Sequence, residues 1–173
     1  MQVIAVVGTK KSGKTTTIEN LIKELTQRGY KVAAIKHIPE PHFTIDTPGK
    51  DTWRYAQAGA KTIISIAANE TATIEKTPIE NISLKTLLKK CRNNDIVLIE
   101  SFKKLATSKK NIPKIVVTKS KKEATNAIAT FKPILAFSGP YNTETLSFKT
   151  PYADALKNPQ KLADTIEKTI LKK

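Results

Sequence analysis

A glycine-rich segment at residues 8–15 has the residue types and spacing of a phosphate-binding loop. It reads Gly-Thr-Lys-Lys-Ser-Gly-Lys-Thr and fits the pattern G-x-x-x-x-G-K-S/T at every fixed position. Glycines let successive backbone N–H groups point at phosphates, Lys14 can reach the β- and γ-phosphates, and the Thr15 hydroxyl can ligate Mg²⁺. A glycine-rich turn without a ligand is the alternative, but the segment follows a hydrophobic strand and opens an amphipathic helix. We therefore expect a nucleoside triphosphate to contact Gly8, Thr9, Lys10, Lys11, Ser12, Gly13, Lys14, Thr15 and Thr16.

Two acidic residues are candidates for binding the metal and orienting an attacking water. Glu100 ends the hydrophobic run 95–100, and ligands of parallel sheets bind at the carboxyl ends of strands. A solvated acid at a strand end is the alternative reading. Asp46 lies in a polar loop and can reach the metal, whereas Asp51 is as readily a helix cap. The expected catalytic residues are Lys14, Glu100 and Asp46, and the expected metal ligands are Thr15, Asp46 and Glu100.

Two further patterns carry less information. His37 and His42 lack a third strong ligand for zinc, so we interpret them as loop residues that line the phosphate pocket. Thr118-Lys119-Ser120-Lys121 invites comparison with the guanine-reading Asn/Thr-Lys-x-Asp motif of GTPases. Lys121 stands where the aspartate would accept hydrogen bonds from guanine, so this segment does not predict guanine recognition.

The elements that must position these residues alternate between strands and helices. Buried parallel strands are predicted at residues 2–7, 31–36, 95–100, 114–118 and 133–137, because these runs are rich in Val, Ile and Leu. A hairpin is predicted at residues 62–67 and 71–76. Helices are predicted after the glycine-rich segment up to Gly29, at residues 51–59, from Ser83 to Cys91, and along the stripe Leu162, Ile166 and Ile170. The spacing of the third helix predicts that Cys91 faces the core. The pattern predicts a three-layer α/β fold with a mostly parallel central sheet.

Length and composition predict one soluble domain. The 173 residues suit a single nucleotide-binding domain over 1–173, with 39% hydrophobic and 26% charged residues. No run comes near the roughly 18 apolar residues that a membrane helix needs, and the first strand leads directly into the phosphate-binding loop rather than resembling a signal peptide. Cys91 is the single cysteine, which favours a reducing, cytoplasmic location.

The net charge of +15 raises the question of a nucleic-acid partner. Almost all of the positive charge is lysine, because the arginines are Arg28, Arg54 and Arg92 alone. Base readout and bidentate phosphate binding favour arginine. We therefore interpret the lysines as a solvated basic surface, including the eight lysines of the segment 103–122, and expect no nucleic-acid or membrane partner.

Five segments together resemble the molybdopterin-guanine dinucleotide biosynthesis protein B (MobB) family. In order they are VVGTKKSGKTTTIENLIKEL, VAAIKH, IDTPGKDTWRYAQAGA, DIVLIESFK and PKIVV. The most specific is residues 46–51 (DTPGKD), followed by Arg54 and by the AGA of residues 58–60. This combination is much less common than a P-loop. The resemblance covers roughly residues 1–118.

The resemblance implies a P-loop NTPase fold of the branch that contains dethiobiotin synthetase and hydrogenase-maturation GTPases. It implies GTP and Mg²⁺ as ligands, slow GTP hydrolysis, and an adapter role for the guanylyltransferase that attaches GMP to the molybdenum cofactor. The implied partners are GTP, molybdopterin or its guanine dinucleotide, that guanylyltransferase, and a second copy of the chain. By matching residues, it places Lys36 and His37 beside the phosphates, Asp46 and Glu100 near Mg²⁺, and Lys50, Asp51 and Arg54 in a loop that closes over them.

The chain departs from the family pattern at several positions. Lys10 and Lys11 stand where the family usually has small residues, Ser101 replaces a glycine, and the histidine-rich loop is altered around His42. These departures keep nucleotide binding but leave the second ligand open. Two other functions remain as alternatives: an ATP-dependent small-molecule kinase or ligase of the dethiobiotin-synthetase type, and a basic NTPase that binds nucleic acid.

Overall fold

The computed structural model describes residues 1–100, 109, 111–146 and 148–171, which form two compact units. The first unit comprises Met1–His37 and Cys91–Lys173, and the second comprises Ile38–Lys90. Part of the lysine-rich segment 103–122, namely residues 103–108 and 110, lies outside the described residues, as does Ser101.

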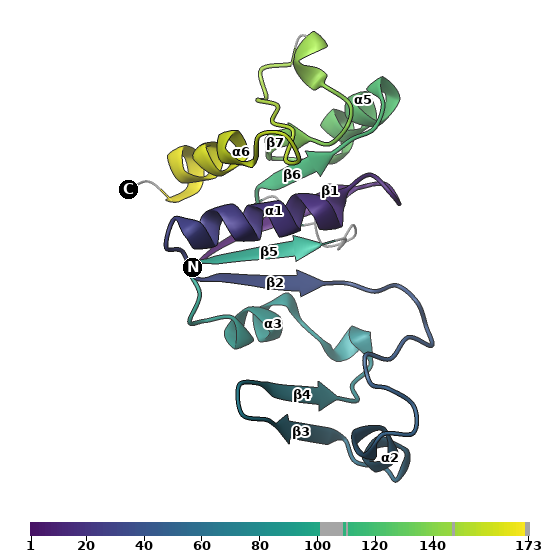
Figure 1. Ribbon diagram of the computed structural model, residues 1–173. Coiled ribbons are helices and arrows are strands. Elements are labelled where there is room, and N and C mark those ends of the chain that lie inside the picture. The colour runs from purple at the N-terminus through teal and green to yellow at the C-terminus, as the bar shows by residue number, and fades with distance from the viewer. Residues whose placement is uncertain (101–108, 110, 147, 172–173) are drawn as a thin grey trace. The chain divides into compact units, whose positions relative to one another are not determined.

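The first unit is built on a five-stranded parallel sheet with the strand order β2-β5-β1-β6-β7 (Figure 1). The strands are β1 (Gln2–Gly8), β2 (Val32–Lys36), β5 (Ile96–Glu100), β6 (Lys114–Val117) and β7 (Ile134–Ser138). Val6 lies opposite Glu100, and Lys36 lies opposite Glu100 on its other side. Because all five strands run the same way, their carboxyl ends meet at one edge. The prediction of these five strands is confirmed.

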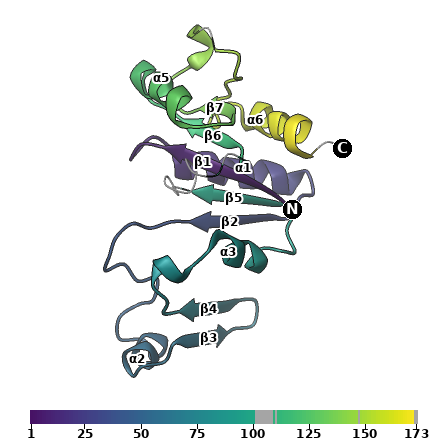
Figure 2. The ribbon, with the colours of Figure 1, turned by 180° about the vertical axis from the view of Figure 1, so that it is seen from behind.

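Helices cover both faces of this sheet. Figures 1 and 2 show α1 (Lys14–Gln27) and α6 (Pro159–Ile166) over one face and α5 (Lys121–Thr130) over the other. α6 continues into a π-helical turn, Glu167–Leu171, and a 3-10 turn, Thr143–Thr145, precedes it. This is the predicted three-layer α/β fold. No helix among the described residues is long and apolar enough to cross a membrane.

The core between α1, α6 and the sheet is aliphatic. Leu21 and Leu25 of α1, Leu98 of β5 and Ile166 of α6 are fully buried in one cluster. Each such side chain contributes about 1.5–3 kcal/mol when it leaves water. The apolar face of α1 is thereby fixed against the strand that precedes it, which also fixes the turn between β1 and α1.

The second unit contains the hairpin of β3 (Thr62–Ile66) and β4 (Thr71–Glu75), which pair antiparallel. Two short helices, α2 (Asp51–Gln57) and α3 (Leu84–Lys90), and a 3-10 turn at Ile79–Asn81 complete it. Among the described residues of this unit, Ile63 is the one large hydrophobic side chain that is buried. The hairpin and both helices are at the predicted places.

Three local features differ from the expectations. Helix α5 was not predicted, because its buried face is formed by small residues, Ala124 and Ala127, rather than by a leucine stripe. The N-cap of α2 is Lys50, and Asp51 is instead the acid of the first turn. Cys91 is half-buried rather than part of the core, because no residue of α3 is fully buried.

Candidate phosphate-binding site

The P-loop, residues 8–15, joins the end of β1 to the start of α1. Gly8 must be a glycine, because a Cβ there would collide with the Val117 carbonyl and lie 2.7 Å from Ser12 Oγ. Gly13 is the N-cap of α1 and has φ 97°, in the left-handed region that favours glycine. The N-terminus of α1 therefore opens directly at the loop, where its unpaired N–H groups and partial positive charge can bind an anion.

Lys10 and Lys11 form an exposed part of the loop. Lys11 has φ 59° and is the one non-glycine residue with positive φ in the described part of the chain. This conformation costs of order 1 kcal/mol for a residue with a Cβ. Ser12 is buried, and its Oγ has no hydrogen-bond partner among the described residues. A buried hydroxyl without a partner is costly, so Ser12 Oγ is suited to bonding a ligand.

Lys14 folds back over the loop, where its Nζ donates a hydrogen bond to the Thr9 carbonyl at 2.6 Å. Burial lowers the pKa of Lys14 from its ordinary value, and the nearby cations Lys36 and Lys119 lower it further. Glu100 and Glu123 oppose this shift without cancelling it. The pKa is therefore lowered mainly because the ammonium group is partly removed from water, and a bound polyphosphate would stabilise its charged form.

The structure brings Glu100 together with Thr15 and Lys36 at the edge of the sheet. Thr15 Oγ1 donates to Glu100 Oε1 at 3.0 Å, and Lys36 Nζ lies 3.6 Å from Glu100 Oε2. The Glu100 side chain is about nine-tenths buried, so this acid is not a freely solvated strand end. A hydroxyl and a carboxylate oxygen side by side are ligands that suit Mg²⁺. Thr16, the next residue after Thr15, is half-buried in the first turn of α1.

A second set of contacts, which the sequence reasoning missed, joins the P-loop to the turn between β6 and α5. Glu123 Oε1 accepts a hydrogen bond from Thr9 Oγ1 at 2.9 Å. Its Oε2 accepts one from the Lys119 backbone N at 3.0 Å. Lys119 Nζ also donates to the Lys10 carbonyl at 3.3 Å. The signal that predicts α5 is the capping pattern Ser120-x-x-Glu123, in which Ser120 is the N-cap.

The remaining predicted site residues lie outside the P-loop. The His37 backbone N donates to the Glu100 carbonyl at 3.2 Å, which keeps His37 at the sheet edge. Asp46 and Arg54 belong to the second unit. Asp46 Oδ1 accepts hydrogen bonds from Thr47 N and Thr52 Oγ1, and its buried Oδ2 has no partner among the described residues. Arg54 Nη1 lies 3.5 Å from Asp51 Oδ1, and both side chains are exposed. Their roles at the phosphates and the metal stay predictions.

The chain matches known proteins over most of its length. The family model of molybdopterin guanine dinucleotide synthesis protein B (MobB) matches residues 3–138. The chain belongs to the MobB family. A Methanocaldococcus jannaschii protein is 43% identical over 124 residues, which cover 70% of this MobB chain and 49% of the relative. The Haemophilus influenzae molybdopterin-guanine dinucleotide biosynthesis adapter protein is 35% identical over 116 residues, covering 66% and 61%. The matched parts thus span about half to three-fifths of these relatives.

Solved MobB structures share the fold. The crystal structure of Bacillus subtilis MobB has a TM-score of 0.75 at 24% identity and covers 97% of both chains. Another crystal structure of molybdopterin-guanine biosynthesis protein B has a TM-score of 0.73 at 23% identity. At this identity the likeness concerns the fold, which is the α/β arrangement with a mostly parallel central sheet described above.

Proposed function

We propose that this MobB-family chain is a GTP-binding adapter protein of molybdopterin guanine dinucleotide biosynthesis with weak Mg²⁺-dependent GTPase activity. The observation that carries the triphosphate part of the proposal is the joined geometry of the P-loop, in which Lys14, Thr15 and Glu100 meet at the N-terminus of α1. The pathway part rests on the family and on the names of its relatives.

Several features of the loop favour a polyphosphate over a single small anion. Two buried or backbone groups, Ser12 Oγ and the helix N-terminus, can bond phosphate oxygens. Lys36 and Lys119 add positive charge to that of Lys14, and both are close enough to lower its pKa. A chain of phosphates can engage all of these groups together, whereas one phosphate cannot.

The residues also fit a magnesium ion. Thr15 Oγ1 and Glu100 Oε1 would hold it, with phosphate oxygens and water as further ligands. Asp46, which belongs to the second unit, stays a predicted third ligand on the sequence alone. When bound, Mg²⁺ neutralises charge on the phosphates. Glu100 would also orient the attacking water, and Lys36, whose Nζ lies 3.6 Å from Glu100 Oε2, would help to fix the orientation of that carboxylate.

We expect GTP hydrolysis to be slow, because few acidic residues at the site could activate a water molecule. Of the acids expected at the site, Glu100 is already bonded to Thr15 and paired with Lys36. Such a site binds a triphosphate firmly and turns it over slowly, which suits an adapter better than a metabolic enzyme. The proposed partners are GTP, molybdopterin or its guanine dinucleotide, and a molybdopterin guanylyltransferase.

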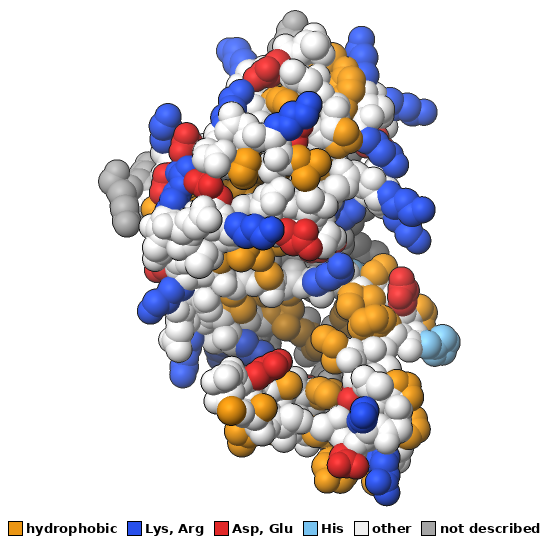
Figure 3. All heavy atoms as spheres, viewed as in Figure 1, with side chains coloured by type: hydrophobic (Ala, Val, Ile, Leu, Met, Phe, Trp, Pro, Cys, Tyr) orange, Lys and Arg blue, Asp and Glu red, His pale blue; other side chains and the backbone are white. Residues whose placement is uncertain are grey.

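We also propose that the chain forms a homodimer through the second unit. Of the eight exposed large hydrophobic side chains among the described residues, six belong to residues 38–90: Phe43, Ile45, Tyr55, Ile64, Ile66 and Ile79. Figure 3 shows hydrophobic side chains on the surface of this unit. A two-stranded hairpin is marginally stable by itself, and an unpaired strand edge readily accepts a further strand. A second copy of the chain would pair with the exposed strand edge and would bury the apolar surface.

The nucleotide assignment is tested by isothermal titration of the protein with GTP and with ATP, each with and without Mg²⁺. We expect GTP to bind more tightly than ATP and Mg²⁺ to strengthen binding. ATP preferred by about tenfold or more, which is roughly 1.4 kcal/mol, would contradict the guanine assignment. Rapid turnover of ATP with one small metabolite would instead support the kinase or ligase alternative.

A further inference from the structure

We propose that Glu123 is a positioning residue that holds the first half of the P-loop in its phosphate-binding shape. One carboxylate accepts hydrogen bonds from Thr9 Oγ1 and from the Lys119 backbone N, at 2.9 and 3.0 Å. It thereby joins the P-loop to the β6–α5 turn, which lies more than one hundred residues later in the chain. The effect on nucleotide binding rests on the proposed function, whereas the contacts themselves do not.

The place of Glu123 in its helix sets this contact apart from an ordinary helix cap. Ser120 is the N-cap of α5, and its Oγ accepts a hydrogen bond from the Glu123 N at 3.3 Å. In a regular capping box the acid at this position reaches back to the backbone N–H of the N-cap residue. Here the carboxylate bonds Lys119, one residue earlier, and its other oxygen bonds Thr9. A locally capping acid therefore makes a long-range contact.

The turn that receives Thr9 is itself firmly anchored. Thr118 is 1% exposed, its N donates to the Ser138 carbonyl at 2.9 Å, and its carbonyl accepts from Tyr141 N at 3.2 Å. Lys119 makes a second contact between this turn and the P-loop, because its Nζ donates a hydrogen bond to the Lys10 carbonyl. The β6–α5 turn is thus part of the sheet edge and can brace the loop.

Bracing matters because Thr9 organises the rest of the loop. Its carbonyl accepts from Ser12 N at 3.3 Å and from Lys14 Nζ at 2.6 Å. Glu123 holds the hydroxyl of the same residue. A loop that is already ordered loses less entropy when it binds phosphates, so the contact should raise affinity without touching the ligand.

The charge of Glu123 would act in the opposite direction. An acid beside an anion-binding loop repels phosphates, so its charge alone predicts that removing it strengthens triphosphate binding. Its position predicts that shortening it weakens binding. The two roles can therefore be separated by variants that change charge and reach independently.

The test uses full-length protein, Mg²⁺·GTP titration, and hydrogen exchange of the loop amides. Glu123→Asp keeps the charge and loses the reach. Glu123→Gln loses the charge and keeps the reach, because its amide oxygen can accept from Lys119 N while its NH2 donates to Thr9 Oγ1. Thr9→Val removes the donor hydroxyl, and Thr9→Ser retains it. Thr125→Val is the matched control, since the Thr125 hydroxyl donates within its own helix to the Lys121 carbonyl.

We expect Glu123→Asp and Thr9→Val each to weaken GTP binding by about three- to tenfold, as for one lost hydrogen bond. The amides of residues 9–13 should exchange faster in both. Glu123→Gln and Thr125→Val should bind at least as tightly as wild type, and Thr9→Ser should bind more tightly than Thr9→Val. Wild-type affinity and wild-type loop exchange in Glu123→Asp and Thr9→Val would overturn the proposal. If the wild-type chain binds no triphosphate, the proposed function fails, while loop exchange still decides whether Glu123 holds the loop.

Discussion

One carboxylate oxygen of Glu100 accepts a hydrogen bond from the Thr15 hydroxyl, and the other forms an ion pair with the Lys36 ammonium group. Replacing it with glutamine keeps the shape and removes the charge. We expect Glu100→Gln to fold normally and to lose Mg²⁺-dependent GTP hydrolysis by roughly 10- to 100-fold. Single-turnover hydrolysis at saturating Mg²⁺ measures the effect.

The control for that variant is Glu144→Gln. Glu144 is also paired with a lysine, Lys161 at 2.8 Å, but its side chain is half exposed. We expect this control to hydrolyse GTP like wild type. Wild-type hydrolysis in Glu100→Gln would reduce Glu100 to a structural acid of the strand end.

The lowered pKa of Lys14 gives a pH dependence with a definite sign. A lysine whose pKa lies below the ordinary 10.5 loses its proton earlier as pH rises. Triphosphate binds best to the protonated form, so affinity should be highest below that pKa and should fall as pH increases through it. Binding measured at increasing alkaline pH, up to the ordinary lysine pKa of 10.5, would show this decline.

Lys14→Arg separates this effect from other titrations. Arginine stays charged throughout that pH range. We expect Lys14→Arg to bind more weakly because its geometry differs, but with a flatter dependence on pH. An equally steep decline in both proteins would show that another group controls the alkaline loss of binding.

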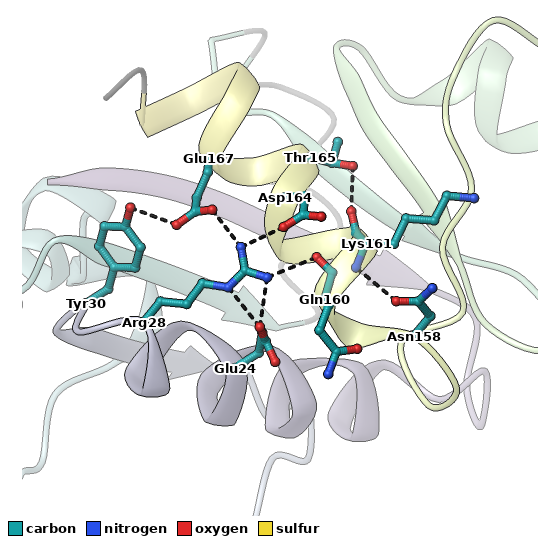
Figure 4. Close-up of polar contacts among 9 residues, drawn as sticks. All are labelled: Glu24, Arg28, Tyr30, Asn158, Gln160, Lys161, Asp164, Thr165 and Glu167. Carbon is teal, nitrogen blue, oxygen red and sulfur yellow. Dashed lines mark hydrogen bonds and ion pairs between the residues drawn. The ribbon is translucent and has the colours of Figure 1, made fainter.

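At the scale of elements, Arg28 ties the end of α1 to α6. Its guanidinium bonds Glu24 of its own helix, and Asp164 and Glu167 across the interface, all within 2.8 Å (Figure 4). Its Nη2 also donates to the Gln160 carbonyl at 3.3 Å. The Arg28 side chain is 22% exposed, so water screens these contacts only in part.

We expect Arg28→Ala to lower the free energy of unfolding by about 1–2 kcal/mol, because several charge-assisted hydrogen bonds are lost at a partly exposed site. Urea denaturation measures the change. Arg92→Ala is the control: Arg92 is exposed, and we expect a change within about 0.5 kcal/mol. Equal stability of Arg28→Ala and wild type would mean that the hydrophobic core alone joins α1 and α6.

Strands and helices with a clear hydrophobic pattern can be predicted from that pattern, whereas a helix such as α5, which lacks it, cannot. The five strands of the sheet are hydrophobic runs, and α1 is marked by leucines at helical spacing and by Gly29 at its end. Helix α5 buries alanines and begins with Lys121 and Lys122, which oppose the helix dipole. The contact between Glu123 and Thr9 joins residues that are far apart in the sequence, so the spacing of residues along the chain does not predict it.

The same limit applies to the site. The pattern of residues 8–15 and the acid at the end of β5 predict that Thr15 and Glu100 lie close together, because parallel strands end at one edge. No periodicity predicts that Ser12 Oγ is buried without a partner, or that Lys11 adopts a positive φ. Both depend on the three-dimensional shape of the loop, in which Ser12 Oγ lies close to Gly8.

At the scale of the whole molecule, the chain divides into a unit with a large aliphatic core and a small unit with an exposed apolar surface. The function of the whole chain as one nucleotide-binding domain stays a prediction. The proposed dimer depends on the small unit. Ile66 is 82% exposed on β3, and a charge there should oppose association.

We expect Ile66→Glu to raise the dimer dissociation constant by roughly tenfold or more, as for a central apolar contact. Sedimentation velocity over a concentration series measures it. Leu156→Glu is the control, because Leu156 is a comparably exposed apolar residue of the first unit. Dissociation constants raised equally by both substitutions, or a wild-type chain that is monomeric throughout, would contradict an interface at the second unit.

The most direct test of triphosphate binding at the P-loop compares the affinity of wild type and Lys14→Ala for Mg²⁺·GTP by isothermal titration. Lys14 lies across the loop with its Nζ on the Thr9 carbonyl, where it can exchange that contact for a phosphate. We expect wild type to bind one GTP per chain and Lys14→Ala to lose measurable binding while keeping its melting temperature. Unchanged GTP affinity in a folded Lys14→Ala protein would contradict the P-loop as the triphosphate site.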